Sequence, residues 1–170
     1  DSGDIISQRS IKILDSDNVG ILWDKMSLLG RDLLKDTLPS IIEGTNERIK
    51  QDEELVTFGL NIKREEEHID FNKTSREIFN QIRGLNPWPS ANVIIDDNEM
   101  KVYDSIIGDR DFKNKQVGEI CDITKKGISV KTSDGEIILT DIKPFGKKRM
   151  DACSYVNGVG KDKLIGKVFK

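Results

Sequence analysis

A cluster of basic residues near the end of the chain has the composition of a phosphate-binding site. Lys147, Lys148 and Arg149 are consecutive, and Lys143 precedes them by four positions. Lysine and arginine side chains that contact phosphates give an affinity that falls steeply with salt, and they position a nucleic acid without reading its sequence. The alternative is that these residues only solvate the surface. We take the cluster, which lies beside a predicted turn, as the first candidate site.

Other residue types that support catalysis or metal binding are scarce. The chain has one histidine, His68, and two cysteines, Cys121 and Cys153, that lie far apart in the sequence. A structural zinc ion usually needs four such ligands, and a Ser-His-Asp or Cys-His site would depend on His68. No nucleophile motif accompanies that histidine. We therefore predict no metal site, a surface role for His68, and reduced structural cysteines.

Charge is distributed unevenly along the chain. Residues 1–70 hold 9 Lys plus Arg against 16 Asp plus Glu, whereas residues 71–170 hold 18 against 14. A change of sign indicates two units, and a basic end indicates a polyanionic partner such as nucleic acid.

Hydrophobic residues make up 36% and charged residues 34%, which is typical of a soluble protein. No apolar run is long enough to span a bilayer and no signal-peptide pattern is present, so we expect a cytoplasmic protein.

The first part of the chain predicts a strand or two followed by a long helix. Isoleucines with partly alternating spacing over residues 5–13 favour extended structure. Apolar residues then recur at helical spacing, with Asp17 as the expected N-cap, Gly44 as the expected stop and Pro39 as a kink or restart. We expect Trp23 and Met26 to serve in packing. A strand and a helix cannot bury their own apolar faces, so we assign residues 1–44 to the end of a doubly wound domain that begins upstream.

The remainder predicts a connector and a second domain. Residues 45–67 are polar and suit a surface linker. From there to the end, residues 68–170, a capping box at Thr74 and Glu77 begins a helix that we expect Gly84 to end. Five or so short strands separated by turn signals follow, and then a short helix capped by Asp151. The predicted class is α+β overall, with a small OB-like β-barrel and flanking helices in this second domain.

The stretch RGLNPWPSA, residues 83–91, connects that helix to the strands. Pro87 and Pro89 fix the backbone on both sides of Trp88, which favours a packing anchor for the indole. The alternative is a stacking platform for a nucleic-acid base. Arg83, at the helix end, is the better candidate for an RNA contact.

Four stretches together resemble the C-terminal half of the methionyl-tRNA formyltransferase family, in the family's order and with about its spacing. RGLNPWP followed by GKKRM is the most specific part, and the resemblance covers essentially the whole chain. The matching stretches are DSGDII, WDKMSLLGRDLLKDTLPSIIEG, IDFNKTSREIFNQIRGLNPWPSA and KPFGKKRMDACSYVNG.

The resemblance implies transfer of a formyl group from 10-formyltetrahydrofolate to the amino group of methionine on initiator tRNA. It implies a Rossmann-like α/β catalytic domain, a linker, and a C-terminal barrel that helps to hold the tRNA. The basic cluster supplies the candidates for that contact, Lys143, Lys147, Lys148 and Arg149, together with Arg83 at the helix end. The family's chemistry rests on an asparagine, a histidine and an aspartate, and only the aspartate has a counterpart here, Asp1. We expect the other two residues and the folate loop to lie upstream, so the chain by itself should be inactive.

Two alternatives remain open at this point. A sugar-amine N-formyltransferase uses the same folate donor and a related two-domain layout, although GKKRM and the basic end fit tRNA better. A free-standing nucleic-acid-binding barrel without activity would not need the DSGDII start or an isolated strand and helix. A formylation assay with each acceptor separates the enzymes.

Overall fold

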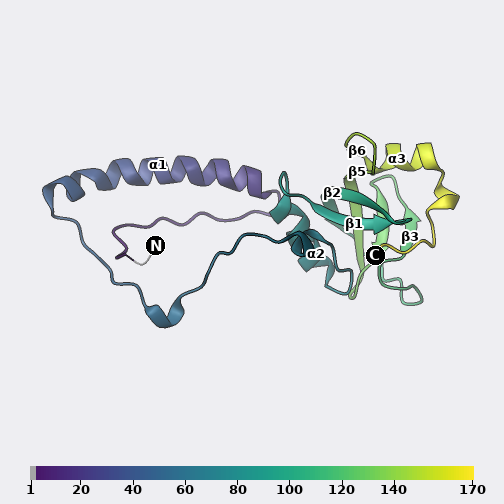
Figure 1. The fold of residues 1–170 in the computed structure, drawn as a ribbon, viewed down its shortest axis with the longest axis horizontal. Coiled ribbons are helices and arrows are strands. Elements are labelled where there is room, and N and C mark those ends of the chain that lie inside the picture. Colours follow the sequence, from purple (N-terminus) through teal and green to yellow (C-terminus); the bar gives the residue numbers. More distant parts are fainter. Residues whose placement is uncertain (1–2) are drawn as a thin grey trace. The chain divides into compact units, whose positions relative to one another are not determined.

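The computed structural model describes residues 3–170, so Asp1 lies outside the described residues. The chain divides into two compact units, residues 1–61 and residues 62–170, and each is described by itself. Within the described part the fold is α+β, with three α-helices and a six-stranded antiparallel sheet (Figure 1).

The first unit is built around one long helix, α1 (Val19–Glu43). The expected cap is displaced by one residue, because the Asn18 side chain accepts the hydrogen bond from the Ile21 amide at 2.9 Å. The Asp17 carboxylate is engaged instead by the Leu14 amide and by the Lys25 ammonium. The stop at Gly44 is confirmed, with a φ of 69°, and the helix continues through Pro39 rather than restarting there.

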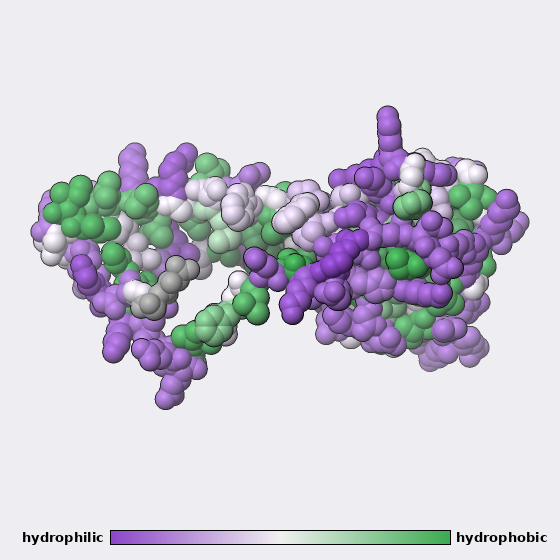
Figure 2. Space-filling view, viewed as in Figure 1, coloured by the Kyte–Doolittle hydropathy of each residue, from purple (hydrophilic) through white to green (hydrophobic). Residues whose placement is uncertain are grey.

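The helix α1 has no buried residue, which contradicts the packing roles expected of its large side chains. Trp23 is 72% exposed and Met26 is 55% exposed. The strands expected over residues 5–13 are reduced to a single bridge between Ile5 and Ile49, and residues 3–61 otherwise add the short 3-10 helix η1 (Glu53–Leu55). Figure 2 shows wide apolar areas over this helix. Helical spacing correctly identified an apolar face, but nothing in the described part of this unit covers it.

The second unit begins with a 3-10 helix, η2 (Arg64–Glu67), and the helix α2 (Ser75–Leu85). The predicted capping box is confirmed, because the Thr74 hydroxyl accepts from the Glu77 amide while the Glu77 carboxylate accepts from the Thr74 amide. Gly84 does not end the helix, which continues to Leu85 and is capped by Asn86.

Six strands follow in an antiparallel sheet of order β1-β2-β5-β4-β3, with β6 also paired to β5. The helix α2 packs on β2, β5 and β1, and the last α-helix, α3, packs on β5 and β6. Asp151 is the N-cap of α3, as predicted. A 3-10 helix, η3 (Lys161–Lys163), follows α3. The bounds are β1 Ala91–Ile95, β2 Asn98–Ile107, β3 Ile120–Ile123, β4 Ile128–Lys131, β5 Glu136–Lys143, β6 Met150–Asp151 and α3 Ala152–Val159.

The turns between strands follow the predicted signals closely. The β1–β2 hairpin turns at Asp96 and Asp97, both with positive φ, one residue before the Asp97-Asn98 pair that is the turn signal of this sequence. The β3–β4 hairpin needs a glycine at position 127, where a Cβ would lie 2.0 Å from the Leu139 carbonyl oxygen. The segment Ser133–Gly135 leads into β5.

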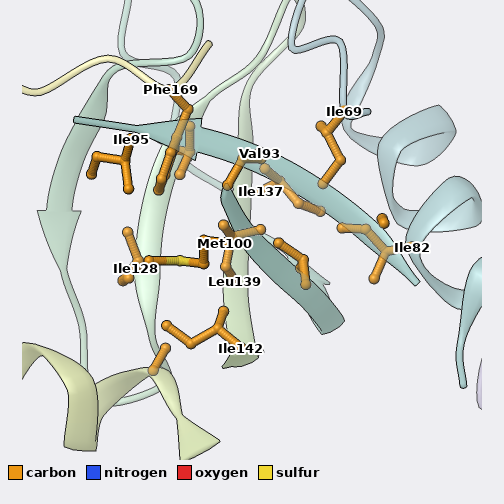
Figure 3. Packing of buried hydrophobic residues seen from close by; sticks show 14 of the residues in the cluster. Ile69, Ile82, Val93, Ile95, Met100, Ile128, Ile137, Leu139, Ile142 and Phe169 are labelled. Atoms are coloured by element: carbon orange, nitrogen blue, oxygen red, sulfur yellow. The ribbon is translucent and has the colours of Figure 1, made fainter. Parts of the chain in front are cut away.

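The core of this unit is aliphatic and lies between the sheet and its helices (Figure 3). Strand residues supply most of it, and α2 adds Ile78, Ile82 and Leu85. Phe169 from the final segment is buried and stacks on Phe71 at 5.8 Å between ring centroids.

The final segment, residues 166–170, pairs with both outer strands of the sheet. Its backbone exchanges hydrogen bonds with Ile120 of β3, at 2.8 and 2.9 Å, and with Ile94 of β1, at 2.8 and 2.9 Å. The two strands at opposite ends of the sheet order are therefore both bonded to the same five-residue stretch.

Candidate nucleic-acid interface

Two lysines lie directly opposite each other on neighbouring strands. Lys101 of β2 and Lys143 of β5 are Cα partners in the antiparallel register. Like charges at opposed positions destabilise a sheet unless an anion compensates them. The Lys101 ammonium donates to the Pro89 carbonyl oxygen at 2.9 Å, and no ion pair to Lys143 occurs among residues 3–170. The pair therefore offers positive charge to a ligand.

An arginine and a tyrosine extend this surface along β2. The Arg149 guanidinium lies 4.1 Å from the centroid of the Tyr103 ring, in cation–π contact. Arg149 also donates to the Asp141 carboxylate at 2.6 and 2.9 Å, and this hydrogen bonding raises the pKa of Arg149. The guanidinium is fixed in place and keeps its charge, although Asp141 offsets part of that charge locally.

The Pro-Trp-Pro stretch is fastened to the same strand. The Asn86 side chain donates to the Tyr103 carbonyl oxygen at 2.8 Å, and the Ser90 amide donates to the Leu85 carbonyl oxygen at 2.8 Å. Trp88 between these attachments is 81% exposed, so the packing anchor expected for the indole is wrong. The two proline rings fix the backbone and leave the indole in solvent.

We call this set of residues the Trp88 surface. The contacts above join residues of β2 and β5 with Arg149, which precedes β6, and they attach the backbone on both sides of Trp88 to β2. Its members are Trp88, Lys101, Tyr103, Lys143 and Arg149.

The other candidate residues lie around this surface rather than in it. The Lys147 ammonium lies 5.5 Å from the centroid of the Tyr155 ring of α3, beside a cavity of about 260 Å³ that Phe145 also lines. Lys148 is exposed and makes no ion pair within the described residues. On α2, Arg83 donates to Asn80 at 2.9 Å and stacks over Phe79. Of the five predicted RNA contacts, the structure brings Lys143 and Arg149 together.

Lys101 and Tyr103 were not predicted as site residues. A signal for them exists in the strand sequence NEMKVYD, where Met100 and Val102 are buried and the intervening residues point away from the core. Their proximity to Lys143 depends on the pairing of β2 with β5, and sequence periodicity does not report which strands pair.

The remaining polar candidates have structural surroundings. The His68 ring Nδ1 lies 3.0 Å from the Asn92 side-chain oxygen. Both cysteines are free and half-buried, and burial raises the pKa of the Cys121 thiol. Within residues 3–170 no three His, Cys, Asp or Glu side chains are grouped as metal ligands would be. None of the helices in that range is long and apolar enough to cross a membrane.

Sequence comparison connects the chain to a known family. The family model described as formyl transferase, C-terminal domain, matches residues 61–160. Methionyl-tRNA formyltransferases from Staphylococcus aureus strains MW2 and Newman are each 51% identical over 168 residues, which is 98% of this chain and 53% of theirs. The chain therefore spans about half the length of the curated relatives it matches.

Solved structures share the fold at lower identity. HypX from Aquifex aeolicus in complex with tetrahydrofolic acid gives a TM-score of 0.62 at 13% identity, over 91% of this chain and 27% of that one. An N-formyltransferase from Helicobacter canadensis, in complex with folinic acid and dTDP-3-aminofucose, gives 0.61 at 24% identity, over 85% and 51%. The family model covers more than half of the chain and the relatives agree with it, so this chain belongs to the formyl transferase C-terminal domain family.

Proposed function

We propose that this chain is part of an enzyme that transfers a formyl group from 10-formyltetrahydrofolate to the amino group of initiator methionyl-tRNA, and that residues 62–170 bind the tRNA. The methionyl-tRNA formyltransferases that are 51% identical to it support the reaction. The observation that carries the tRNA-binding role is the Lys101–Lys143 pair beside Arg149 and Tyr103. A sheet that places like charges opposite each other gains stability from a polyanion.

The finer architecture is part of the same proposal. The final segment bonds both outer strands, which supports an OB-like barrel in residues 68–170. The helix of residues 19–43 has no buried side chain, which supports assigning residues 1–44 to the end of a Rossmann-like catalytic domain, with residues 45–67 as linker. A helix with an uncovered apolar face needs a neighbouring layer.

Asp1 is the proposed catalytic residue of this chain. Attack of a neutral amine on the formyl carbon creates an oxyanion and releases a proton, so a positioned acid–base pair and hydrogen-bond donors are required. A carboxylate at position 1 would orient a histidine imidazole and assist proton transfer. The chain has one histidine, His68, which lies in the second unit against Asn92. We therefore expect the 170-residue chain to be inactive, and formylation of Met-tRNA by it would contradict this assignment.

The tRNA-binding role is tested by removing charge without unfolding the sheet. The variant K101Q/K143Q/K148Q removes the opposed lysine pair and the exposed Lys148 next to Arg149, and the control K113Q/K125Q/K126Q changes three exposed lysines elsewhere with the same change in net charge. A plot of log affinity against log salt falls with salt, and each lysine–phosphate interaction that is removed makes its slope shallower by about 0.7 to 0.9. We expect the first variant to reduce this slope by about 2 for initiator tRNA, and the control to reduce it by less than about 1. Equal slopes would place the tRNA elsewhere.

A second candidate function is formylation of a sugar amine. It is favoured by the fold shared with the Helicobacter canadensis N-formyltransferase, whose complex contains dTDP-3-aminofucose. The Trp88 surface fits a polyanion better, because Lys101 and Lys143 lie opposite each other and neither forms an ion pair within residues 3–170. Binding measurements with initiator tRNA and with a dTDP-amino sugar distinguish the two functions: the tRNA proposal expects micromolar or tighter binding of tRNA and none of the sugar nucleotide.

A further inference from the structure

The tryptophan of the Pro-Trp-Pro stretch is a large apolar side chain that the described residues leave in solvent. Trp88 is 81% exposed, while the residues around it are held in place. Asn86 is bonded to Tyr103, and the Pro89 carbonyl accepts from Lys101. An indole presented on a fixed backbone loses little conformational entropy when a flat ligand stacks on it.

The surroundings of the indole identify the chemistry of such a ligand. Lys101 bonds to the residue that follows Trp88, and it lies opposite Lys143 on the neighbouring strand. Asp141 and its strand partners Asp104 and Asp151 are the acidic groups near Arg149, and Arg149 is bonded to Asp141, so the lysine pair is the part of this surface without a carboxylate partner among the described residues. The backbone that carries the exposed indole is therefore attached at the lysine pair, through the Pro89 carbonyl. Proteins that bind single-stranded nucleic acids use this combination: cationic side chains contact the phosphates, and aromatic rings stack on the bases.

We propose that Trp88 stacks on an unpaired nucleotide of the RNA, whose phosphate contacts Lys101 and Lys143. This inference rests on the proposed function and names the part of the tRNA that this surface binds: a loop or a single-stranded end. Bases within a duplex are already stacked on their neighbours, and an aromatic side chain reaches only bases that are unpaired and splayed out. A lysine surface alone would bind duplex and single strand through phosphates in the same way.

The second tryptophan makes a direct measurement possible. Trp23 is 72% exposed and belongs to the other unit, so the variant W23F leaves Trp88 as the single indole without disturbing the core. In the W23F chain, we expect quenching of the Trp88 fluorescence by a short single-stranded RNA and by initiator tRNA. A blunt-ended RNA duplex of equal phosphate count should produce much less quenching at equal occupancy.

Affinity measurements separate stacking from charge. Loss of one stacked base weakens binding about 5- to 150-fold. We expect W88A to lose affinity for the single strand within this range without a change in its salt dependence, and W88F to retain most of the affinity. The matched control is F58A, because Phe58 is another exposed aromatic, at 83%, in the connector region. Circular dichroism of each variant verifies that it is folded.

The possible outcomes are distinct. If tRNA binds with the salt dependence described above but W88A binds as tightly as wild type, the stacking proposal is wrong and the tRNA-binding function stands. If neither RNA binds, both are wrong. A blue shift of the Trp88 emission that grows with protein concentration in the absence of RNA would identify a second copy of the chain as the occupant and would overturn the proposal.

Discussion

Arg110 neutralises a carboxylate that is buried in the sheet, and its replacement provides a strong test of how the second unit is held together. The Glu136 side chain is 1% exposed and accepts hydrogen bonds from the Arg110 guanidinium at 2.6 and 3.1 Å. Arg110 also donates to Asp122 at 2.8 Å. In R110A, Glu136 keeps only the Ser129 hydroxyl and the amide of residue 110 as donors. A buried charge would then lack its counter-ion.

The size of the effect follows from this geometry. Removing one partner of a buried ion pair costs about 3 to 5 kcal/mol. Arg110 is itself 38% exposed, so we expect the lower end, about 3 kcal/mol, with the exposed contact to Asp122 adding less than about 1 kcal/mol. For a unit of this size, about 4 °C of melting temperature corresponds to each kcal/mol, which predicts a drop of about 12 °C at pH 7.

The pH dependence of stability gives a second, independent test of the same ion pair. Burial raises the pKa of Glu136, but the hydrogen bonds from Arg110 and Ser129 outweigh it and the net pKa is lowered. The bond from Arg110 lowers the pKa of Asp122 to about 2. Carboxylates with lowered pKa values stabilise the fold above their unfolded pKa values, and this stability is lost as the pH falls through the folded values. Wild type should lose stability between about pH 4.5 and pH 2, and R110A should lose less of it.

Thermal and urea unfolding followed by circular dichroism measure these differences in the 170-residue chain. The double variant R110A/E136Q removes the unpaired charge as well and should be more stable than R110A. The control R149A removes an arginine whose carboxylate partner, Asp141, is 30% exposed, and it should cost no more than about 1 kcal/mol. Two results would contradict the argument that Glu136 is a buried charge. In the first, R110A and R149A are destabilised equally; in the second, R110A/E136Q is no more stable than R110A.

Three further predictions concern local structure and can be checked by the same unfolding measurements. T74A removes the N-cap that pairs with Glu77 and should cost about 1 kcal/mol. G127A places a Cβ against the Leu139 carbonyl and should cost about 3 kcal/mol, whereas G158A, in a helix with open space around it, should stabilise by up to about 1 kcal/mol; equal effects would refute the argument. Residues 62–170 alone should retain cooperative unfolding, because every residue of the aliphatic core lies within them.

Local signals were predicted well because they depend on neighbours in the sequence. The capping box at Thr74 and the cap at Asp151 satisfy backbone groups within a few residues. The stop expected at Gly84 was wrong, because a helix needs no glycine where the side chain of Asn86 is bonded to the next element.

Features that depend on distant neighbours were harder to predict. Apolar spacing placed Trp23 and Met26 on one helix face, but spacing cannot report whether another layer covers that face. Proline rings around Trp88 correctly indicated rigidity, but a rigid backbone does not require a buried side chain. In the candidate interface, Lys143 was found from its charge cluster, while Lys101 required knowledge of the strand pairing.

The final segment of the chain also covers parts of both outer strands of the sheet. An unpaired outer strand offers a row of free N–H and C=O groups on which another molecule can assemble. Here β1 and β3 would both be such templates, and residues 166–170 occupy part of each through Ile94 and Ile120. Burial of Phe169 against Phe71 keeps this cover in place. We expect Phe169→Ser, which removes the buried ring, to loosen this segment and to leave both outer strands open to pairing with another copy of the chain.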